Sequence, residues 1–346
     1  MDNDMKQFVI DVVKEASELA LAVQQEMVTP TTVEKSDKSP VTVCDLAIQA
    51  LVSRRLAEQF PNDALVGEES NDVFADEAGQ KLLDQVTGFV QRFEPSENRT
   101  SVASWIERGR DEGDENRYWV LDPVDGTKGF LRRQQYAIAL GLTIDKTPVL
   151  GALGCPCWPR GGEPARATAR ETITAPVGRL DSSCNSEGTV YFASQGEGAF
   201  SIPLHGTDLT PIHVSDVSDA SLARVLRSVE KGHTNVGQID YIVEKLNIKT
   251  DPVSIDSQVK YGVLASGGAE ILLRLISPKM PNYKEKIWDQ CAGVVVLQEA
   301  GGIVSDLDGK PLDFTHGRTL AENRGVCATN GKIHSAVLDA ITAVGA

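Results

Sequence analysis

The chain has 346 residues, 41% of them hydrophobic, and a formal net charge of −15 at pH 7. This length predicts one large α/β domain or two closely packed ones. The acidic balance disfavours nucleic acid as a partner, because there is no basic face to displace counterions from a phosphate backbone. No apolar run approaches the length of a membrane span, so we expect no membrane insertion.

The N-terminal residues are acidic and then amphipathic, unlike a signal peptide or a transit peptide. We therefore expect a structural helix over residues 5–27 and a cytoplasmic location. The six cysteines are scattered without the spacing of a disulfide scaffold or a zinc site, which predicts reduced thiols. A monomer is the default expectation.

The first half of the chain mixes helices with strands. A polar stretch with prolines at residues 29–45 predicts a loop or hairpin, and a helix follows from near Asp45. The segment ALVGEES resembles a strand that runs into a loop, residues 74–110 are predicted to be mostly helical, and RYWVLD is a short strand. Strand-like runs separated by turn signals fill residues 134–215.

From about residue 216 onward helices and strands alternate. The expected elements are a helix at 235–247, a strand at 252–255, a helix after Ser257, a strand at 269–276 and a helix at 288–300. These patterns predict an α+β first half and an α/β second half, that is, a layered sandwich of alternating helix and sheet layers. We expect two closely packed subdomains, residues 1–215 and 216–346.

The segment WVLDPVDGTKGF, residues 119–130, carries two aspartates three positions apart. We expect the strand to end at Asp122 and Pro123 to turn the chain, so that both carboxylates and an intervening carbonyl face one point. Converging oxygen ligands suit Mg²⁺, and paired metal ions suit in-line phosphoryl transfer. Gly126 and Thr127 follow, with amides that can approach an anion closely. Taken alone, DPVD more often marks a plain Asp-Pro turn.

Aspartyl-phosphate phosphatases of the haloacid dehalogenase type offer a rival interpretation, since they also carry an Asp-rich signature followed by Gly-Thr. Their aspartates lie two positions apart, on one face of a strand. Here the spacing is three, across a proline. This spacing favours Asp122 as a metal ligand rather than as a covalent nucleophile.

Two further acidic positions are candidates. VGEES places Glu68 and Glu69 at the end of a strand, where an active-site loop would begin. EKIWDQCAGVVVLQEAGG places Asp289 at the start of an apolar helix, where an aspartate is usually a cap but can also complete a metal site near a bound phosphate. Motifs of Ser hydrolases, P-loop enzymes and HExxH zinc enzymes are absent from the sequence.

Taken together, Glu68-Glu69, DPVDGT and Trp288-Asp289 resemble the signature of the Mg²⁺-dependent, lithium-sensitive inositol monophosphatase superfamily, over nearly the whole chain. Within it the sequence is most similar to the 3′(2′),5′-bisphosphate nucleotidases. That narrower resemblance rests on SDKSPVTVCD, DGTKGFLR, EKGH with DSQVKYG, and EKIWD. An inositol monophosphatase would read closer to DGTxNF. Residues 156–188 diverge from the family pattern, and GRDEGDENRYW is less glycine-rich than that pattern.

The resemblance implies a role for each candidate residue. It implies two or three Mg²⁺ ions, held by Glu68, Asp122, the carbonyl of Val124, Asp125 and Asp289. It implies that Asp45 accepts a proton from a water that Thr127 helps to orient, and that the amides of Gly126 and Thr127 bind phosphate. It also implies nucleotide contacts by His233, Ser257, Lys260 and Arg274.

The activity implied is hydrolysis of the 3′-phosphate of adenosine 3′,5′-bisphosphate, and of its sulfated form 3′-phosphoadenosine 5′-phosphosulfate, by water and without a covalent intermediate. The expected partner is thus a small nucleotide bisphosphate. Two alternatives stay open: an inositol polyphosphate 1-phosphatase of the same superfamily, and a catalytically inactive nucleotide sensor.

Overall fold

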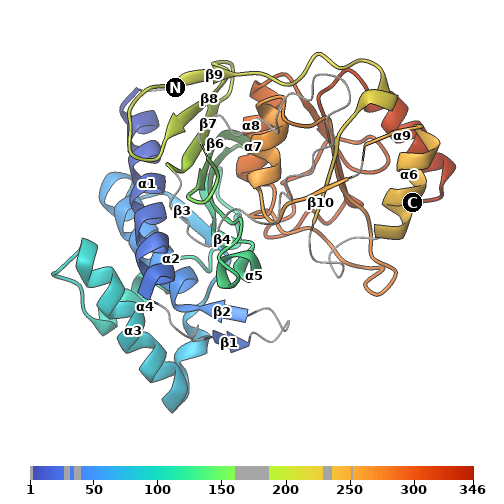
Figure 1. Ribbon diagram of the computed structural model, residues 1–346. Coiled ribbons are helices and arrows are strands. Elements are labelled where there is room, and N and C mark those ends of the chain that lie inside the picture. The colour runs from blue at the N-terminus through green and yellow to red at the C-terminus, as the bar shows by residue number, and fades with distance from the viewer. Residues whose placement is uncertain (1–2, 27–31, 35–39, 160–186, 229–235, 251) are drawn as a thin grey trace.

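The computed structural model describes residues 3–26, 32–34, 40–159, 187–228, 236–250 and 252–346. Two large sheets alternate with layers of helices (Figure 1). Helices α1 (Asn3–Glu26) and α2 (Val43–Gln59) cover one face of the first sheet, and α7 (Val259–Ala265) and α8 (Cys291–Glu299) lie between the two sheets. On the far side of the second sheet lie α6 (Val236–Lys245) and α9 (His334–Ala343). The layered sandwich predicted from the sequence is therefore confirmed.

The first sheet has seven strands in the order of the chain, β3-β4-β5-β6-β7-β8-β9. Only β3 and β4 are parallel, and every other neighbouring pair is antiparallel. The strands are β3 (Ala64–Gly67), β4 (Arg117–Asp125), β5 (Ala137–Ile144), β6 (Thr147–Cys155), β7 (Thr189–Ser194), β8 (Ala199–Pro203) and β9 (Thr210–Ile212). The helical elements η1 (Asn71–Phe74), α3 (Glu77–Phe93) and α4 (Arg99–Glu107) separate β3 from β4.

The second sheet has five strands in the order β11-β10-β12-β14-β13 and mixes parallel with antiparallel pairs. Its strands are β10 (Val225–Arg227), β11 (Val253–Ser254), β12 (Ile271–Arg274), β13 (Ile303–Ser305) and β14 (Val326–Thr329). Near the N-terminus, β1 (Thr32–Glu34) and β2 (Pro40–Thr42) pair antiparallel within the stretch predicted to be a loop or hairpin. Short elements complete the described chain: α5 (Thr127–Leu131) and η2 (Ala220–Leu222).

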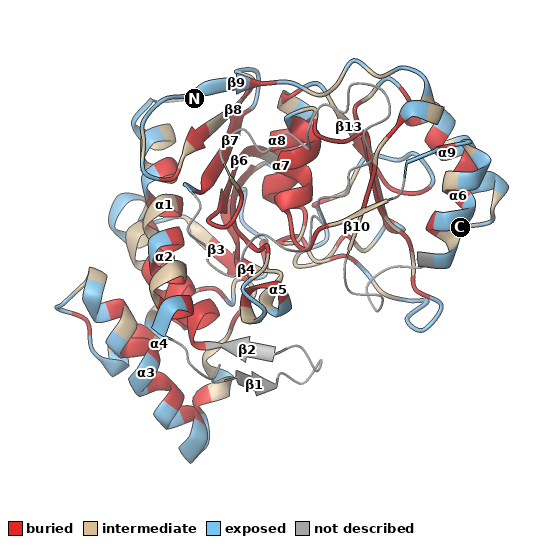
Figure 2. Cartoon of the chain, in the orientation of Figure 1, coloured by how far each residue is buried: buried red, intermediate tan, exposed pale blue. Residues whose placement is uncertain are grey.

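The central helices are buried on nearly every side (Figure 2). Helix α8 packs directly on β5 and β6, because two strand positions carry no side chain where the helix crosses them. A Cβ atom on Gly151 would lie 2.3 Å from the Ala292 carbonyl oxygen, and one on Gly141 would lie 2.6 Å from the Cys291 sulfur. This close approach brings the start of α8 next to the end of β4, where the candidate site lies.

Several sequence predictions need correction. The strand RYWVLD does not end at Asp122 but continues to Asp125, and the helix expected at 288–300 begins only at Cys291. Of the described cysteines, four have free thiols, whereas Cys157 is disulfide-bonded, so the prediction of reduced thiols is wrong for that residue. Most of the divergent stretch 156–188 lies outside the described residues.

The two sheets draw their strands from either side of residue 215, yet α7 and α8 pack on both sheets. The division into subdomains 1–215 and 216–346 therefore stays a prediction. Among the described residues, no helix is both long and apolar enough to cross a membrane.

Candidate metal centre

A bulge near the end of β4 places two carboxylates on the same side of the sheet. Asp122 pairs with Ala139 of β5 and Asp125 pairs with Ala137, so three residues of β4 span two residues of β5. In a regular strand, side chains three positions apart point to opposite faces of the sheet. The extra residue of the bulge brings Asp122 and Asp125 onto the same face. Pro123, which has no N–H to donate, fits such an interruption of the ladder.

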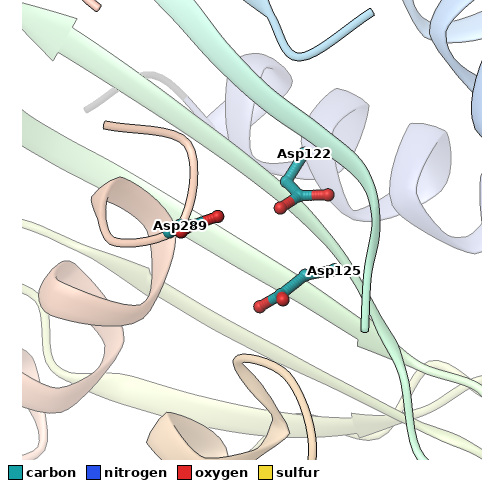
Figure 3. A group of neighbouring side chains, drawn as sticks. All are labelled: Asp122, Asp125 and Asp289. Carbon is teal, nitrogen blue, oxygen red and sulfur yellow. The ribbon is translucent and has the colours of Figure 1, made fainter. Parts of the chain in front are cut away.

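Asp289 completes a three-carboxylate cluster from a distant part of the chain. One oxygen from each of Asp122, Asp125 and Asp289 lies within 4.8 Å of the others. Figure 3 shows the two strand aspartates turned toward Asp289, which comes from the turn before α8. The prediction that these three residues meet is thus confirmed as geometry.

Glu68 and Asp45 face the same cluster from two other elements. Glu68 follows β3, and its amide donates to the carbonyl of Leu121 (3.2 Å). Asp45 lies in the first turn of α2 and is only 1% exposed. Both carboxylates contribute to raising the pKa of Asp122.

The electrostatics of the cluster favour a bound cation. Burial, followed by repulsion from the surrounding carboxylates, raises the pKa of Asp122 well above its usual range. Burial and Asp289 raise the pKa of Asp125 to about 7, against the lowering effect of Lys260 and Arg274. The buried Oδ1 atom of Asp122 has no hydrogen-bond partner. Carboxylates that repel one another, one of them with a buried oxygen that lacks a protein partner, fit a hard divalent cation such as Mg²⁺.

Beyond Asp125, Gly126 adopts a left-handed conformation (φ 89°), and α5 begins at Thr127. The Phe130 amide donates to the Gly126 carbonyl (3.0 Å), and the Thr127 hydroxyl donates to the carbonyl of Val124 (3.2 Å). The predicted helix start after the aspartates is therefore present, and the predicted phosphate-binding amides lie directly beside the carboxylate cluster.

Side chains, together with main-chain hydrogen bonds of the turn, hold Asp289 in place. Its Oδ2 accepts from the Arg274 guanidinium (3.1 Å), which also pairs with the buried Glu285 (2.8 Å). Gln290 donates to Glu285 (2.9 Å) and accepts from the Tyr261 hydroxyl (2.6 Å). Asp289 is not a helix cap, because Gln290 occupies the residue before α8.

The loop before α7 connects Asp125 of β4 to the Asp289 turn through Gln258. Its backbone amide donates to Asp125 Oδ2 (2.6 Å). Its side chain donates to the Trp288 carbonyl (2.9 Å) and accepts from the Gly293 amide (3.1 Å). Ser257, a predicted nucleotide contact, lies in this loop with φ 69°, and a Cβ on Gly126 would lie 3.0 Å from its Cβ.

Lys260, another predicted nucleotide contact, is 4% exposed. Its ammonium donates to the carbonyls of Ile255 (3.0 Å) and Ser257 (2.8 Å). Burial lowers the pKa of Lys260 to about 8, and the nearby Asp125 opposes that shift. The structure therefore brings Ser257, Lys260 and Arg274 to the cluster, whereas His233 lies outside the described residues.

Several residues that hold the candidate ligands in place were not among the predicted site residues. Gln258 and Glu285 stood inside the quoted stretches DSQVKYG and EKIWD, but only their neighbours received roles. Gln49 is buried and bonds both backbone groups of Glu69 (2.8 and 3.0 Å). Its position four residues after Asp45, one helical turn onward, was the available signal.

Sequence comparison relates this chain to one protein family and to named relatives. Residues 2–345 match the model of the inositol monophosphatase family. A Schizosaccharomyces pombe protein named 3′(2′),5′-bisphosphate nucleotidase is 37% identical over 98% of this chain and 95% of its own length. A rice protein of the same name is 36% identical over 94% of this chain and 90% of its own length.

Solved structures share the fold at lower identity. The Thermotoga maritima IMPase superposes with a TM-score of 0.64 at 19% identity and covers 99% of this chain and 98% of its own. The inositol monophosphatase from Anabaena has a TM-score of 0.59 at 20% identity, covering 97% and 96%. These likenesses confirm the layered fold expected from the sequence.

Proposed function

Since this chain belongs to the inositol monophosphatase family, we propose that it is a Mg²⁺-dependent phosphatase that converts adenosine 3′,5′-bisphosphate to AMP and phosphate. The observation that carries the proposal is the convergence of Asp122, Asp125 and Asp289, with a buried oxygen on Asp122 that lacks a partner. The names of the relatives support a nucleotide substrate. The sulfated form, 3′-phosphoadenosine 5′-phosphosulfate, is a second substrate in this proposal.

Two or three Mg²⁺ ions would be held by one set of oxygens from Glu68, Asp122, the Val124 carbonyl, Asp125 and Asp289. When bound, Mg²⁺ would offset the carboxylate charge, make a water more acidic and stabilise charge on the leaving 3′-oxygen. Mutual repulsion among the carboxylates, visible in the raised pKa of Asp122, supports this part of the proposal.

The chain's own residues supply proton transfer and anion binding. In this proposal Asp45 accepts the proton of the attacking water, and Thr127 orients that water. The amides of Gly126 and Thr127 face the phosphoryl oxygens and neutralise charge as it develops there. The left-handed Gly126 and the start of α5 at Thr127 support these assignments, because both amides belong to the residues directly after Asp125.

The second phosphate of the nucleotide needs cationic partners in a chain this acidic, and we propose Lys260 and Arg274, with Ser257 and His233 at the nucleoside. In the described conformation both cations already have partners. A 5′-phosphate would compete with Glu285 and Asp289 for Arg274, and with two backbone carbonyls for Lys260.

The test compares substrates. Phosphate release from adenosine 3′,5′-bisphosphate, its sulfated form, inositol 1-phosphate and inositol 1,4-bisphosphate is measured with Mg²⁺, with EDTA and with added Li⁺. We expect the nucleotide to be hydrolysed fastest and EDTA to abolish the reaction.

Other outcomes would redirect the assignment. Faster turnover of either inositol phosphate would favour the inositol polyphosphate 1-phosphatase. Tight nucleotide binding without turnover would identify the chain as a sensor. Undiminished activity in EDTA would remove the metal from the proposal.

A further inference from the structure

Arg318 lies between β13 and β14. Its segment, residues 318–320, pairs with residues 285–287, which come shortly before Asp289. The Ile287 amide donates to the Arg318 carbonyl (3.2 Å), and the Leu320 amide donates to the Glu285 carbonyl (2.9 Å). Between these bonds, Lys286 and Thr319 form an isolated antiparallel bridge. The backbone of Arg318 is thus tied to the segment that presents Asp289.

The guanidinium of Arg318 reaches across to the other side of the site. It donates to the carbonyl of Gly67 (2.6 Å) and to the carbonyls of Gly109 (3.1 Å) and Asp111 (2.9 Å). It also stacks on the Trp288 ring, 4.8 Å from the ring centroid. A planar group with donors on two edges and an aromatic ring on one face is held in a single orientation.

These contacts place Arg318 against the residue directly before each of two proposed ligands. Gly67 precedes Glu68, and Trp288 precedes Asp289. Other bonds fix the Glu68 loop relative to its own sheet: the Glu68 amide donates to the Leu121 carbonyl, and Gln49 bonds Glu69. Arg318 joins that loop to the turn that carries Asp289.

We propose that Arg318 is a positioning residue that sets the distance between Glu68 and Asp289 and thereby the affinity of the site for divalent cations. This inference rests on the proposed function, because it takes both carboxylates as ligands of one metal centre. Partners outside the ligand shell commonly change metal affinity by about 10- to 100-fold.

The test measures Mn²⁺ binding to metal-free protein from the electron paramagnetic resonance signal of free Mn²⁺, independently of activity. We expect R318M to bind Mn²⁺ about tenfold or more weakly than wild type. R318K should lie between the two, because an ammonium cannot serve three carbonyls and stack as a plane. In turnover assays, R318M should need more Mg²⁺ for half-maximal rate but recover most of its rate at saturating Mg²⁺.

R108M is the matched control. Arg108 is also partly buried and donates to two backbone carbonyls, those of Ser53 (3.1 Å) and Asp63 (2.5 Å). Neither residue adjoins a proposed ligand. R108M should lose thermal stability yet keep wild-type Mn²⁺ affinity, which separates positioning from a general loss of structure.

The outcomes distinguish failure of the role proposed for Arg318 from failure of the proposed function. Wild-type Mn²⁺ affinity in folded R318M, or an equal loss in R318M and R108M, would overturn this inference and leave the proposed function standing. If R318M fails to fold by circular dichroism, R318K decides, and wild-type affinity in R318K has the same meaning. If wild-type protein binds no Mn²⁺, the metal site of the proposed function fails, and the inference fails with it.

Discussion

Two regions supply the cluster of Asp122, Asp125 and Asp289, and the protein holds them in different ways. Asp122 and Asp125 lie on β4, whose backbone pairs with β5 on both sides of the bulge. Asp289 lies in a turn before α8, where side chains of Arg274 and Gln258 add to the main-chain hydrogen bonds. The strand region is fixed by a ladder of main-chain hydrogen bonds, whereas the turn region adds a buried network of side chains to its main-chain bonds.

This difference determines what a substitution removes. On β4 the carboxylates can be replaced without disturbing the hydrogen bonds that position them, so the loss should fall on function. Around Asp289 the same side chains that aim the ligand also satisfy one another inside the protein, so the loss should fall on stability as well.

The largest expected effect is that of Asp125→Asn. Asparagine keeps an oxygen that can accept from the Gln258 amide but removes the negative charge that the cation needs. Loss of several kcal/mol of charge stabilisation in the transition state corresponds to a fall in Mg²⁺-dependent turnover of about 10³-fold. Phosphate release and circular dichroism are measured together, and the fold should be unchanged.

The control for Asp125→Asn is Asp145→Asn, which makes the same change in charge in the exposed turn between β5 and β6. It should retain full turnover. Near wild-type turnover in Asp125→Asn would remove Asp125 from the metal site, and unfolding of that variant would break the distinction between the two regions.

A smaller effect, on stability, is expected for Arg274→Met. The substitution leaves Glu285, which is 5% exposed, and Asp289 without their shared cation. Removing one partner of a buried ion pair costs about 3 kcal/mol of unfolding free energy. The measurement is urea denaturation of metal-free protein.

Arg324→Met is the matched control for this variant, because the Arg324–Asp308 pair (2.8 Å) is exposed. Its loss should cost less than about 1 kcal/mol. Equal midpoints for Arg274→Met and wild type would show that the Asp289 turn does not depend on its network.

The same two regions show how far the sequence alone could predict the centre. Most helices and strands followed from hydrophobic spacing, and the meeting of Asp122, Asp125 and Asp289 followed from family resemblance. The bulge did not, because a shift in register depends on the partner strand and leaves no trace in the periodicity of β4 itself.

Positioning residues were harder still to find. The side chains of Gln258 and Arg318 form hydrogen bonds with backbone groups far along the chain. Nearly every residue offers a backbone carbonyl and amide, so the identity of the bonded residue does not show in the sequence that such a bond exists. Asp289 was expected at the start of a helix. The apolar pattern of α8 predicts that a helix is present and which side is buried, but it does not predict the residue at which the helix begins.

The smallest effect concerns the metal-free protein and sharpens the contrast between the regions. The pKa of Asp125 is about 7 in the folded protein against an ordinary value of 3.8. A raised folded pKa means that the protonated form stabilises the fold, so this stability is present below about pH 4 and is lost as the pH rises through 7. Because Asp125 is partly exposed, the loss should be about 1 to 2 kcal/mol rather than the roughly 4 kcal/mol of the full shift.

Asp125→Asn isolates this contribution, since asparagine does not titrate. In EDTA, the stability of wild type relative to Asp125→Asn, measured by urea denaturation at pH 4 to 8, should fall as the pH rises, whereas Asp145→Asn should follow wild type. Saturating Mg²⁺ should abolish the fall, because the cation offsets the same repulsion that the proton does at low pH. Parallel pH profiles for wild type and Asp125→Asn without metal would mean that burial and Asp289 do not destabilise the Asp125 carboxylate strongly enough to need a cation.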